Sequence, residues 1–564
     1  MKRAIIFLFT GFILLTSSCE DQTINSVPLD LADASVVYGD SLKLVDYINN
    51  LYTYVPSGYG RFSNAMLASV TDEAVFAPKS TLISRWNTGA WGPTYLPDNP
   101  LTNNYRGIHL THVYRDQIHP FISDKIMKES GRNQSYAQVL FIRALLSFEL
   151  LKRFGGYPIP LKSISVNEAV AIPRSTIDET VAYIESLCDS AVMHLPVIVS
   201  DANIGRATKG AAFALKSRLY LYAASKLYNN PDSPYDTVEH GKYDPEKWDK
   251  AASAAAEVIN LKNGSVPVYS LGNLANNQIF TTIKNTEVIF SKLSANSNAL
   301  EQVNAPVGLQ NGGGGNCPTL DLVDAYYKLD GTEFDWTNTR DAANPFLRRD
   351  PRLAINILYN GTVYLDNHTV ETFTGGSDVT GSVNATRTGF YLRKFMNPVA
   401  NWWGTAASGP HPYVIFRYAE ILLNYAEAMN EMYGPDADPK SYGMTARQAI
   451  KLIRQRAGLR GNLDFAGVIP VGDKDKMRTA IYKERQIELA FEDHRYFDLR
   501  RWKLAETVLN RPVRGVKITN LGNFTYSYEI VEVENRVFLP KMYYYPFPQS
   551  ELSRNKMLIQ NKDW

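Results

Sequence analysis

Three glutamate residues near the C-terminus have a spacing that could support acid–base chemistry. Glu484, Glu488 and Glu492 recur every four residues in the run between residues 484 and 502. At 100° per residue, this spacing places the three carboxyl groups on one stripe of a helix, beside a stripe of apolar side chains. Carboxyl groups paired at the edge of a core can act as a general acid and a general base.

The residues that follow this stripe favour a structural interpretation. Arg495, Arg500 and Arg501 come directly after the glutamates, and a guanidinium group can hold a carboxylate through two parallel hydrogen bonds. Three carboxylates on one face repel one another unless cations lie beside them. We therefore expect an ion-paired helix end in which these arginines neutralise the glutamates, with a catalytic carboxyl pair as the alternative.

A second chemically capable cluster lies between residues 59 and 105. Glycine and proline residues interrupt this segment, so its aromatic side chains lie in loops. A tryptophan in a loop is either buried by its neighbours or presents a flat face to a ligand. The polar and aromatic members of the cluster are Tyr59, Arg61, Asp72, Glu73, Arg85, Trp86, Asn87, Trp91, Tyr95 and Tyr105.

This combination of residues suits a groove for carbohydrate. The C–H-rich face of a sugar packs on an indole ring, and its hydroxyl groups form hydrogen bonds with Asn, Asp and Arg. A peptide can use a similar surface, and aromatic residues that only fill a loop core are the alternative at any one position. The ligand-contacting residues that we expect are Asp72, Arg85, Trp86, Asn87, Trp91 and Tyr95, faced by Trp402 and Trp403 in a later loop.

Other catalytic and metal-binding patterns are missing from the sequence. It has no Gly-x-Ser-x-Gly elbow and no His-Glu-x-x-His helix. The glycine run 312–315 lacks the lysine of a phosphate-binding loop, and His109, His112 and His119 lack nearby acidic or cysteine partners for zinc. We expect no catalytic residue, metal or cofactor. A glycoside hydrolase is the main competing enzyme class, because it requires only two suitably placed carboxyl groups.

Composition limits the possible partners. The chain has 564 residues and 34 tyrosines, enough to bury a large core. Its 59 basic residues become 57 without Lys2 and Arg3, which equals the 57 acidic residues. There is no basic run interleaved with aromatic residues, so the sequence does not indicate binding to nucleic acid.

Residues 1–18 have the parts of an export signal. Lys2 and Arg3 form a basic start, an apolar stretch follows, and small residues precede Cys19. A cysteine at this position resembles the lipid attachment site of bacterial lipoproteins, although Leu15 lies one residue further from it than usual. We expect diacylglycerol on Cys19 and a tether over residues 19–40, with ordinary secretion as the alternative. The other cysteines, Cys188 and Cys317, are expected to be unpaired and structural.

The periodicity of apolar residues predicts a mostly helical protein. Helices are expected over 135–154, from the capping box at Thr176 and Glu179 to residue 194, over 208–228, from Asp244 to 260, and over 446–456. A further helix carries Ile415, Ala419, Leu422, Ala426 and Met429 on one stripe. These helices form pairs of the tetratricopeptide type, in which each pair covers the apolar face of its neighbour.

Residues 261–412 have a different pattern. They contain many Asn, Thr and Gly residues and short β-like runs such as 286–291. We therefore divide the mature chain into a region of helix pairs, 41–260, and a C-terminal region, 261–564. There is no clean linker between them, so we expect the two to be intertwined in one body.

Several segments resemble the SusD/RagB family, lipoproteins that bind nutrients on the surface of Bacteroidetes-type bacteria. The run ERQIELAFEDHRYFDLRRW at 484–502 is similar to the C-terminal signature of that family. Other similar segments, in order, are PTLDLVDAY at 318–326, RDPRL at 349–353, FRYAEILLNYAEA at 416–428, YPFPQSEL at 545–552 and QNKDW at 560–564. Phe547 and the pair Lys562 and Asp563 depart from the usual family residues.

The resemblance implies a fold and a role. It implies a right-handed superhelix of helix pairs below an irregular, loop-rich ligand-binding region with few short strands. It also implies a non-catalytic receptor, anchored by lipid in the outer membrane and facing the cell exterior, that hands an oligosaccharide to a TonB-dependent (SusC-like) transporter. The family places ligand residues after an acidic stretch like Ser69–Glu73, which adds weight to Asp72, Arg85, Trp86 and Trp91. A peptide receptor, a glycoside hydrolase and a protein-binding scaffold are the alternatives.

Overall fold

The computed structural model describes residues 40–163, 171–230, 242–365, 367–397 and 408–564. Helices dominate these ranges, as the periodicity predicts. The longer helices are α2 (Ser41–Thr53), α4 (Leu101–Val113), α5 (Glu129–Phe154), α7 (Ile177–His194), α8 (Lys209–Ala224), α9 (Glu246–Ile259), α15 (Tyr418–Tyr433), α16 (Ala446–Arg456) and α17 (Lys474–Glu488). The shorter ones are α3 (Thr81–Asn87), α10 (Gln278–Thr281), α11 (Ala299–Asn304), α12 (Leu320–Ala325), α13 (Thr339–Ala343), α14 (Pro351–Asn356), α18 (Arg495–Arg501), α19 (Ala505–Leu509) and α20 (Gln549–Arg554).

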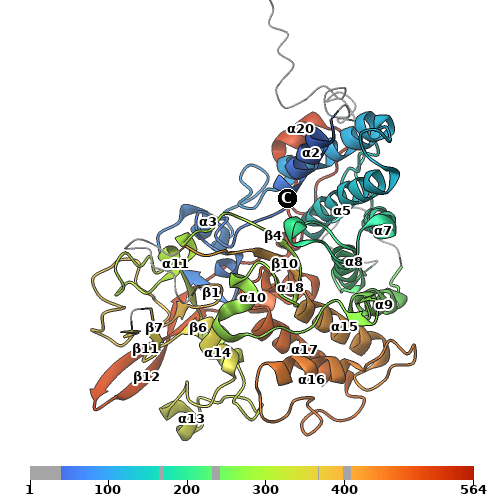
Figure 1. The fold of residues 1–564 in the computed structure, drawn as a ribbon. Helices are drawn as coiled ribbons and strands as arrows, with labels where there is room; N and C mark the ends of the chain where they lie inside the picture. Colours follow the sequence, from blue (N-terminus) through green and yellow to red (C-terminus); the bar gives the residue numbers. More distant parts are fainter. Residues whose placement is uncertain (1–39, 164–170, 231–241, 366, 398–407) are drawn as a thin grey trace, which may run out of the picture.

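The long helices pack as successive pairs. α5 packs on α7, α8 on α9, and α15 on both α16 and α17, and α9 joins α15 across a wide separation in sequence. In Figure 1 these helices follow one another down one side of the molecule, from α5 near the top to α16 and α17 near the bottom. The predicted helix-pair scaffold is confirmed.

Local signals fix the ends of these helices. The Thr176 hydroxyl accepts a hydrogen bond from the Glu179 backbone N–H, while the Glu179 carboxylate accepts one from the Thr176 N–H, so the predicted capping box is present. Gly155 ends α5 with φ = 72°, a conformation that glycine adopts more readily than other residues. Small side chains such as Ala144 and Ala214 are fully buried where helices cross.

Strands are short and form six two-stranded sheets within the described residues. The pairs β1–β5 and β4–β10 join segments far apart in the sequence, so each ties the N-terminal or middle region to a later one. The strands are β1 (Ala74–Phe76), β2 (Lys262–Asn263), β3 (Val266–Pro267), β4 (Val288–Lys292), β5 (Asn316–Pro318), β6 (Ile357–Leu358), β7 (Val363–Tyr364), β8 (His368–Thr369), β9 (Tyr391–Leu392), β10 (Tyr413–Arg417), β11 (Val513–Gly522) and β12 (Thr525–Glu534).

One helical assignment from the sequence is wrong. Ile415 shares the apolar stripe of α15 by periodicity, but it lies in β10, which pairs with β4, and α15 begins only at Tyr418. A short apolar run at the start of a helix has no periodicity of its own, so the ladder partner decides its conformation. β10 and α15 together connect the loop-rich region to the helical scaffold.

The hairpin of β11 and β12 projects from the body at the lower left of Figure 1. Its two-residue turn consists of Asn523 and Phe524, both with positive φ, and the Phe524 side chain is 97% exposed.

Elsewhere, Cys188 and Cys317 are buried and unpaired. Within the described ranges, no helix is both long and apolar enough to cross a membrane.

Candidate functional site

The glutamate stripe is buried and ion-paired. Arg352 donates to Glu484 and Glu488 at 2.6 and 2.9 Å, and Arg454 donates to the second Glu484 oxygen at 3.0 Å. Arg417 binds Glu488 at 2.7 Å. The further contacts of the stripe join Arg456 to Glu488, and Arg417 and Lys394 to Glu492. The expectation of an ion-paired helix end is confirmed, but the cations are not the arginines that follow the stripe.

These contacts form a charge-neutral layer inside the protein. Five carboxylates, Glu287, Asp350, Glu484, Glu488 and Glu492, meet five cations within the described part of the chain, Arg352, Lys394, Arg417, Arg454 and Arg456. Burial alone would raise the pKa of Glu488, but Arg456, Arg417 and Arg352 outweigh burial and hold this pKa well below its usual range. The carboxyl groups therefore act as structural anions.

The arginines of the signature bind elsewhere because the chain turns sharply after α17. Phe491 and Asp493 have φ values of 65° and 63°. These two left-handed residues turn the chain back before α18 begins. Arg501 then donates to Glu427 at 2.6 and 2.7 Å, and Arg500 donates to backbone carbonyl groups. Arg495 reaches Asp72. The partners predicted from sequence proximity are wrong for this reason.

Asp72, a predicted ligand residue, is held by this signature. Its two carboxylate oxygens accept hydrogen bonds from Arg495 Nε and Nη2 at 2.8 and 2.7 Å. The neighbouring Glu73 is buried and accepts a hydrogen bond from the Phe491 N–H at 3.3 Å. Burial and the charge of Asp72 raise the pKa of Glu73 well above its usual value. This segment thus ties the N-terminal loops to the signature.

Trp86 and Asn87 also contact the C-terminal region. The Trp86 side chain is 5% exposed and meets the rings of Phe62 and Tyr496 edge-on, with centroids 5.2 and 5.7 Å away. Asn87 Nδ2 donates at 3.2 Å to both the Ser69 carbonyl and the Glu534 carboxylate. In this structure the Trp86 ring is covered by protein, as in the alternative in which aromatic residues fill the loop core.

Trp91 has a similar environment, whereas Arg85 and Tyr95 are half-exposed. The Trp91 ring, 7% exposed, lies against Tyr545 and Trp564 with centroids 5.5 and 4.9 Å away. The Arg85 guanidinium carbon lies 3.5 Å from the centre of the Tyr95 ring. Of the predicted residues in this cluster, Asp72, Arg85, Asn87 and Tyr95 are partly buried, whereas Trp86 and Trp91 are buried. Cys19, Trp402 and Trp403 lie outside the described residues.

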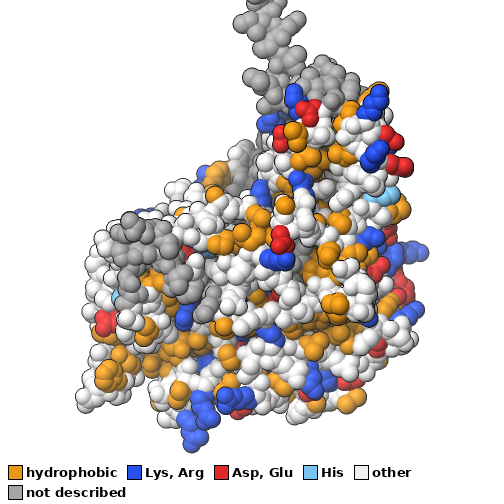
Figure 2. Space-filling model, in the orientation of Figure 1, with side chains coloured by type: hydrophobic (Ala, Val, Ile, Leu, Met, Phe, Trp, Pro, Cys, Tyr) orange, Lys and Arg blue, Asp and Glu red, His pale blue; other side chains and the backbone are white. Residues whose placement is uncertain are grey.

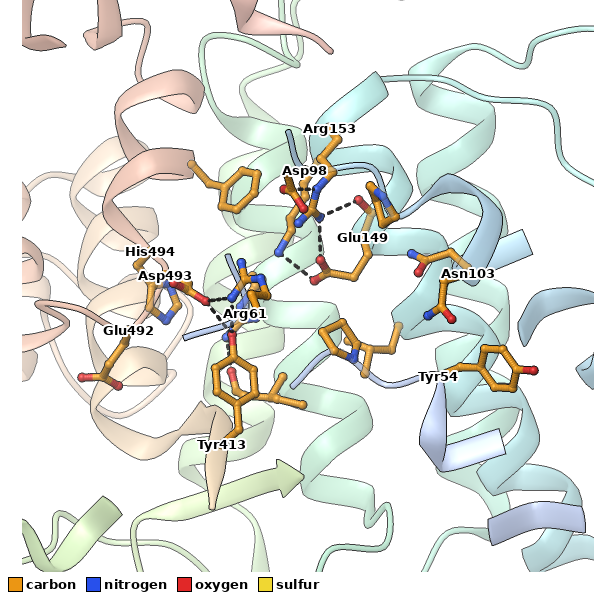
Figure 3. A pocket seen from close by; sticks show the side chains of 18 of the residues that line it. Tyr54, Arg61, Asp98, Asn103, Glu149, Arg153, Tyr413, Glu492, Asp493 and His494 are labelled. Carbon is orange, nitrogen blue, oxygen red and sulfur yellow. Dashed lines mark hydrogen bonds and ion pairs between the residues drawn. The ribbon is translucent and has the colours of Figure 1, made fainter. Parts of the chain in front are cut away.

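The structure brings a further group of polar residues around a cavity of about 150 Å³. Figure 3 shows Arg61, Asp493 and Tyr413 facing Arg153, Asp98 and Glu149 across it, with Tyr54 and Asn103 to one side. The cavity lies between the end of α2, the start of α4, α5, α8 and β10, and the turn after α17 closes it. It adjoins the loop cluster defined above. Arg61 belongs to both, and Asp98 of the lining follows Tyr95 of the cluster by three residues.

Ion pairs fix the side chains around the cavity. Arg153 donates to Asp98 at 2.7 Å and to Glu149 at 2.6 Å. Lys152 Nζ lies 2.7 Å from the other Glu149 oxygen. On the opposite side, Asp493 accepts hydrogen bonds from Arg61 and, at 2.6 Å, from the Tyr413 hydroxyl. Such mutual contacts keep the polar groups oriented without a ligand.

The lining of the cavity is balanced in charge. The described lining holds four cations, Arg61, Lys152, Arg153 and Arg218, and four carboxylates, Asp98, Glu149, Glu492 and Asp493. Of these, Glu492 is held by Arg417 and Lys394, and Arg218 binds Glu420. Burial lowers the pKa of His494 and keeps it neutral. Burial raises the pKa of Glu149, but Lys152 and Arg153 outweigh it and hold the pKa at about 2. Burial lowers the pKa of Lys152 to about 8.

These values define what the cavity can do chemically. A glycosidase needs one carboxyl group whose raised pKa keeps it protonated as a general acid. Glu149 is a carboxylate at neutral pH and cannot supply that proton. The cavity instead offers fixed donors and acceptors for hydrogen bonds. No group of three or more His, Cys, Asp or Glu side chains in the described ranges could hold a metal ion.

Most of the cavity residues escape detection from sequence. Arg61 belongs to the predicted cluster, but Asp98, Asn103, Glu149 and Tyr413 do not. One signal was available in the last turns of α5, where Glu149, Lys152 and Arg153 interrupt the mostly apolar, buried stretch 144–154. Charged residues in such a position require partners or a polar cavity.

Comparison with known proteins agrees with this architecture. Residues 286–564 match the model of the SusD family, and residues 31–221 match a model described as starch-binding and associating with the outer membrane. The chain belongs to the SusD family. Two of the motifs quoted above have a common structural role. The RDPRL turn supplies Arg352, and the FRYAEILLNYAEA helix supplies Arg417 at its start. Both bind the glutamates of the SusD signature.

Individual relatives match along most of their length. SusD-like protein P25 of Formosa agariphila is 23% identical over 484 residues, which are 81% of this chain and 77% of that protein. A solved SusD-like protein from Bacteroides fragilis is 25% identical with a TM-score of 0.76, covering 94% of this chain and 99% of the other. A SusD-like carbohydrate-binding protein from the same species is 22% identical, with a TM-score of 0.73 and coverages of 93% and 100%.

Proposed function

We propose that this SusD-family protein is a non-catalytic receptor that captures an oligosaccharide at the cell surface. Its relatives support the ligand class, because one is described as carbohydrate-binding and one matching family model as starch-binding. Family membership does not by itself locate a ligand. The location in our proposal rests on the geometry of this chain.

The observation that carries the proposal is the charge-balanced polar cavity of Figure 3. A sugar hydroxyl group both donates and accepts hydrogen bonds, and the cavity presents three guanidinium groups and one ammonium group as donors beside four carboxylate acceptors. A charged ligand would upset that balance inside a low-dielectric site. A cavity of about 150 Å³ can hold several water molecules, and in our proposal one terminal sugar unit takes their place.

The half-exposed pair of Arg85 and Tyr95 extends this site toward the surface. It lies on the loop that leads into the cavity at Asp98, and an aromatic ring stacked on a guanidinium group gives a rigid platform for a second sugar unit. Asp72, Trp86, Asn87 and Trp91 lie near this loop in sequence and are held by contacts to the C-terminal region. We propose that they position the platform.

A receptor of this kind needs a partner and an anchor. We propose that diacylglycerol on Cys19 holds the protein in the outer membrane, facing the exterior, beside a TonB-dependent transporter that receives the ligand. Anchoring raises the effective concentration of the receptor at the transporter. Co-purification of a barrel protein with wild type from outer membranes tests the partnership, and loss of membrane attachment in Cys19→Ala tests the anchor.

Blocking the cavity tests the binding site. Asn103 lines the cavity from the exposed first turn of α4, so Asn103→Trp fills the opening with little effect on folding. Thr102→Trp is the matched control, because Thr102 is an exposed neighbour outside the lining. Calorimetry against a panel of oligosaccharides and peptides should show binding at least ~10-fold weaker for Asn103→Trp than for wild type, with Thr102→Trp unchanged. Equal affinities for the two variants would place the ligand elsewhere. Binding to peptides alone would show that the ligand is a peptide and not an oligosaccharide.

A further inference from the structure

A second hollow, of about 400 Å³, has a chemistry opposite to that of the cavity. It lies at the lower edge of the molecule, beside α13. Its charged lining consists of Lys328, Asp330, Arg340, Asp341, Arg348 and Arg460. Figure 2 shows Lys and Arg side chains gathered on the edge where Figure 1 places α13.

Backbone contacts bring two of the arginines together from distant parts of the chain. The Leu329 N–H donates to the Arg348 carbonyl at 2.7 Å, and the Arg460 N–H donates to the Leu329 carbonyl at 2.8 Å. Arg348 and Arg460 therefore flank the same residue. Arg340 reaches the hollow from α13. The fold thus places three exposed guanidinium groups around one space.

These three arginines differ from the buried arginines of the protein. The buried Arg349 donates to the carbonyl groups of Pro345, Val323 and Tyr326, each at 2.7 Å. By contrast, the side chains of Arg340, Arg348 and Arg460 have no hydrogen-bond or ion-pair partner among the described residues. Their donors are available to a ligand.

The hollow also carries a surplus of positive charge. Its described lining holds four cations and two carboxylates, and both carboxylates are already engaged. Asp341 accepts a hydrogen bond from Lys328 Nζ at 3.1 Å. Asp330 accepts hydrogen bonds from the Thr332 N–H and hydroxyl at 3.0 and 2.7 Å. The four cations therefore exceed the two carboxylates by two charges, unlike the cations of the cavity.

We propose that this arginine pocket binds the carboxylate or sulfate group of an acidic oligosaccharide. A guanidinium group donates two parallel hydrogen bonds to an oxyanion, and three such groups around one space favour an anionic ligand over a neutral one. The proposal rests on the proposed function, since it assigns the pocket to part of a saccharide ligand. It adds a preference for acidic glycans that the balanced cavity does not provide.

Matched ligands test this preference. The probes are tri-galacturonate and a sulfated carrageenan tetrasaccharide, each compared by calorimetry with its neutral form, the methyl ester or the desulfated sugar. We expect at least one acidic probe to bind wild type at least ~10-fold more tightly than its neutral form. Sodium sulfate should compete more strongly than sodium chloride at equal ionic strength, because the pocket recognises the oxyanion itself. Competition by sulfate without any preference for the acidic sugars would limit the site to free anions and overturn the proposal.

Substitutions of the three arginines identify the pocket. Arg348→Gly should remain folded, because Arg348 has φ = 53°, which glycine adopts more readily. It should lose roughly tenfold in affinity for the acidic probe, as should Arg340→Gln and Arg460→Gln. The control Arg511→Gln, an exposed arginine outside the pocket, should change nothing.

The outcomes separate this inference from the proposed function. If a variant that carries all three substitutions still prefers the acidic probes, the proposed role of the arginine pocket is wrong. Binding of neutral sugars to wild type with no gain from an acidic group would overturn the pocket and leave the receptor function standing. Failure of every saccharide to bind would overturn both.

Discussion

Asp72 and Arg495 lie 423 positions apart in sequence and form a two-pronged ion pair, with hydrogen bonds of 2.8 and 2.7 Å. Their side chains are 13% and 11% exposed, so solvent screens the pair weakly. Arg495 belongs to the SusD signature and Asp72 to the loop region proposed to support the ligand platform. This part of the signature therefore ties the loops around Asp72 to the C-terminal region.

Breaking this pair should destabilise the fold. Asp72→Asn leaves the Arg495 guanidinium poorly solvated and without its counter-charge, so the free energy of unfolding should fall by about 3 kcal/mol. Arg495→Met should have a similar effect, and the double variant should lose less than the sum of the two. Urea unfolding of the four proteins measures this coupling, with the exposed Asp46→Asn as the control. Additive effects would show that the two residues act independently.

Glu73 should make stability decrease as pH rises. Burial and the charge of Asp72 raise the pKa of Glu73 well above its usual value, so the folded protein keeps a proton that the unfolded chain releases above about pH 4.3. Stability is then lost between that pH and the folded pKa. Glu73→Gln removes this loss, and the variant should be more stable than wild type at pH 7.5, by on the order of 1 kcal/mol, but not at pH 4. Thermal unfolding at both pH values tests this, with the exposed Glu529→Gln as control. A stability difference independent of pH would contradict it.

Ligand binding should weaken at alkaline pH. Burial lowers the pKa of Lys152 to about 8, so its ammonium group in the cavity loses its proton near that pH. A hydrogen bond from a charged donor is stronger than one from a neutral amine, and affinity for the saccharide should fall roughly tenfold between pH 7 and pH 9.5. Lys152→Gln should bind with an affinity that varies little over this range. Calorimetry across the pH series decides, and an unchanged pH profile in the variant would exclude Lys152 as the cause.

The tip of the β11–β12 hairpin should accept glycine with a gain in stability. Phe524 has φ = 57° and is 97% exposed, so its ring contributes little packing while its backbone is in the left-handed region. Phe524→Gly should raise the free energy of unfolding by about 1 kcal/mol. Phe524→Ala also removes the ring but keeps a Cβ atom, so it should show little or no gain. A similar gain in both variants, measured by thermal unfolding, would assign the effect to the ring and not to the backbone.

Local patterns predict the scaffold well. The expected helix over 446–456 matches α16, and the capping box at Thr176 opens α7 as expected. Each of these elements is specified by periodicity and caps within its own segment. Ile415 shows the limit, because a strand partner far away in sequence decided its conformation.

Long-range partners are not predictable in the same way. The cations that neutralise Glu484 and Glu488 include Arg352, which is 132 and 136 positions away, and no local spacing relates them. Sequence proximity favoured Arg495, Arg500 and Arg501, but a reversal of the chain at Phe491 directs these residues elsewhere. The cavity escaped prediction for the same reason, since six separate segments supply its walls.

The exposure of aromatic residues also depends on distant contacts. The composition around Trp86 and Trp91 fits a sugar platform as well as a loop core, and only the positions of Tyr496, Tyr545 and Trp564 show that both rings are covered. Arg85 and Tyr95 lie in the same segment but are only partly buried. Residue type therefore identified the loop, and tertiary packing selected which members face solvent.

As a receptor, the protein should bind a saccharide without changing it. The direct measurement is calorimetric titration of leader-free protein with the tightest-binding oligosaccharide, followed by chromatography of that ligand after overnight incubation with stoichiometric protein. Binding should be saturable and weakened by Asn103→Trp, and the ligand should be recovered intact. Release of shorter products by wild type, and loss of that release on substitution of Glu149 or Asp98, would contradict it.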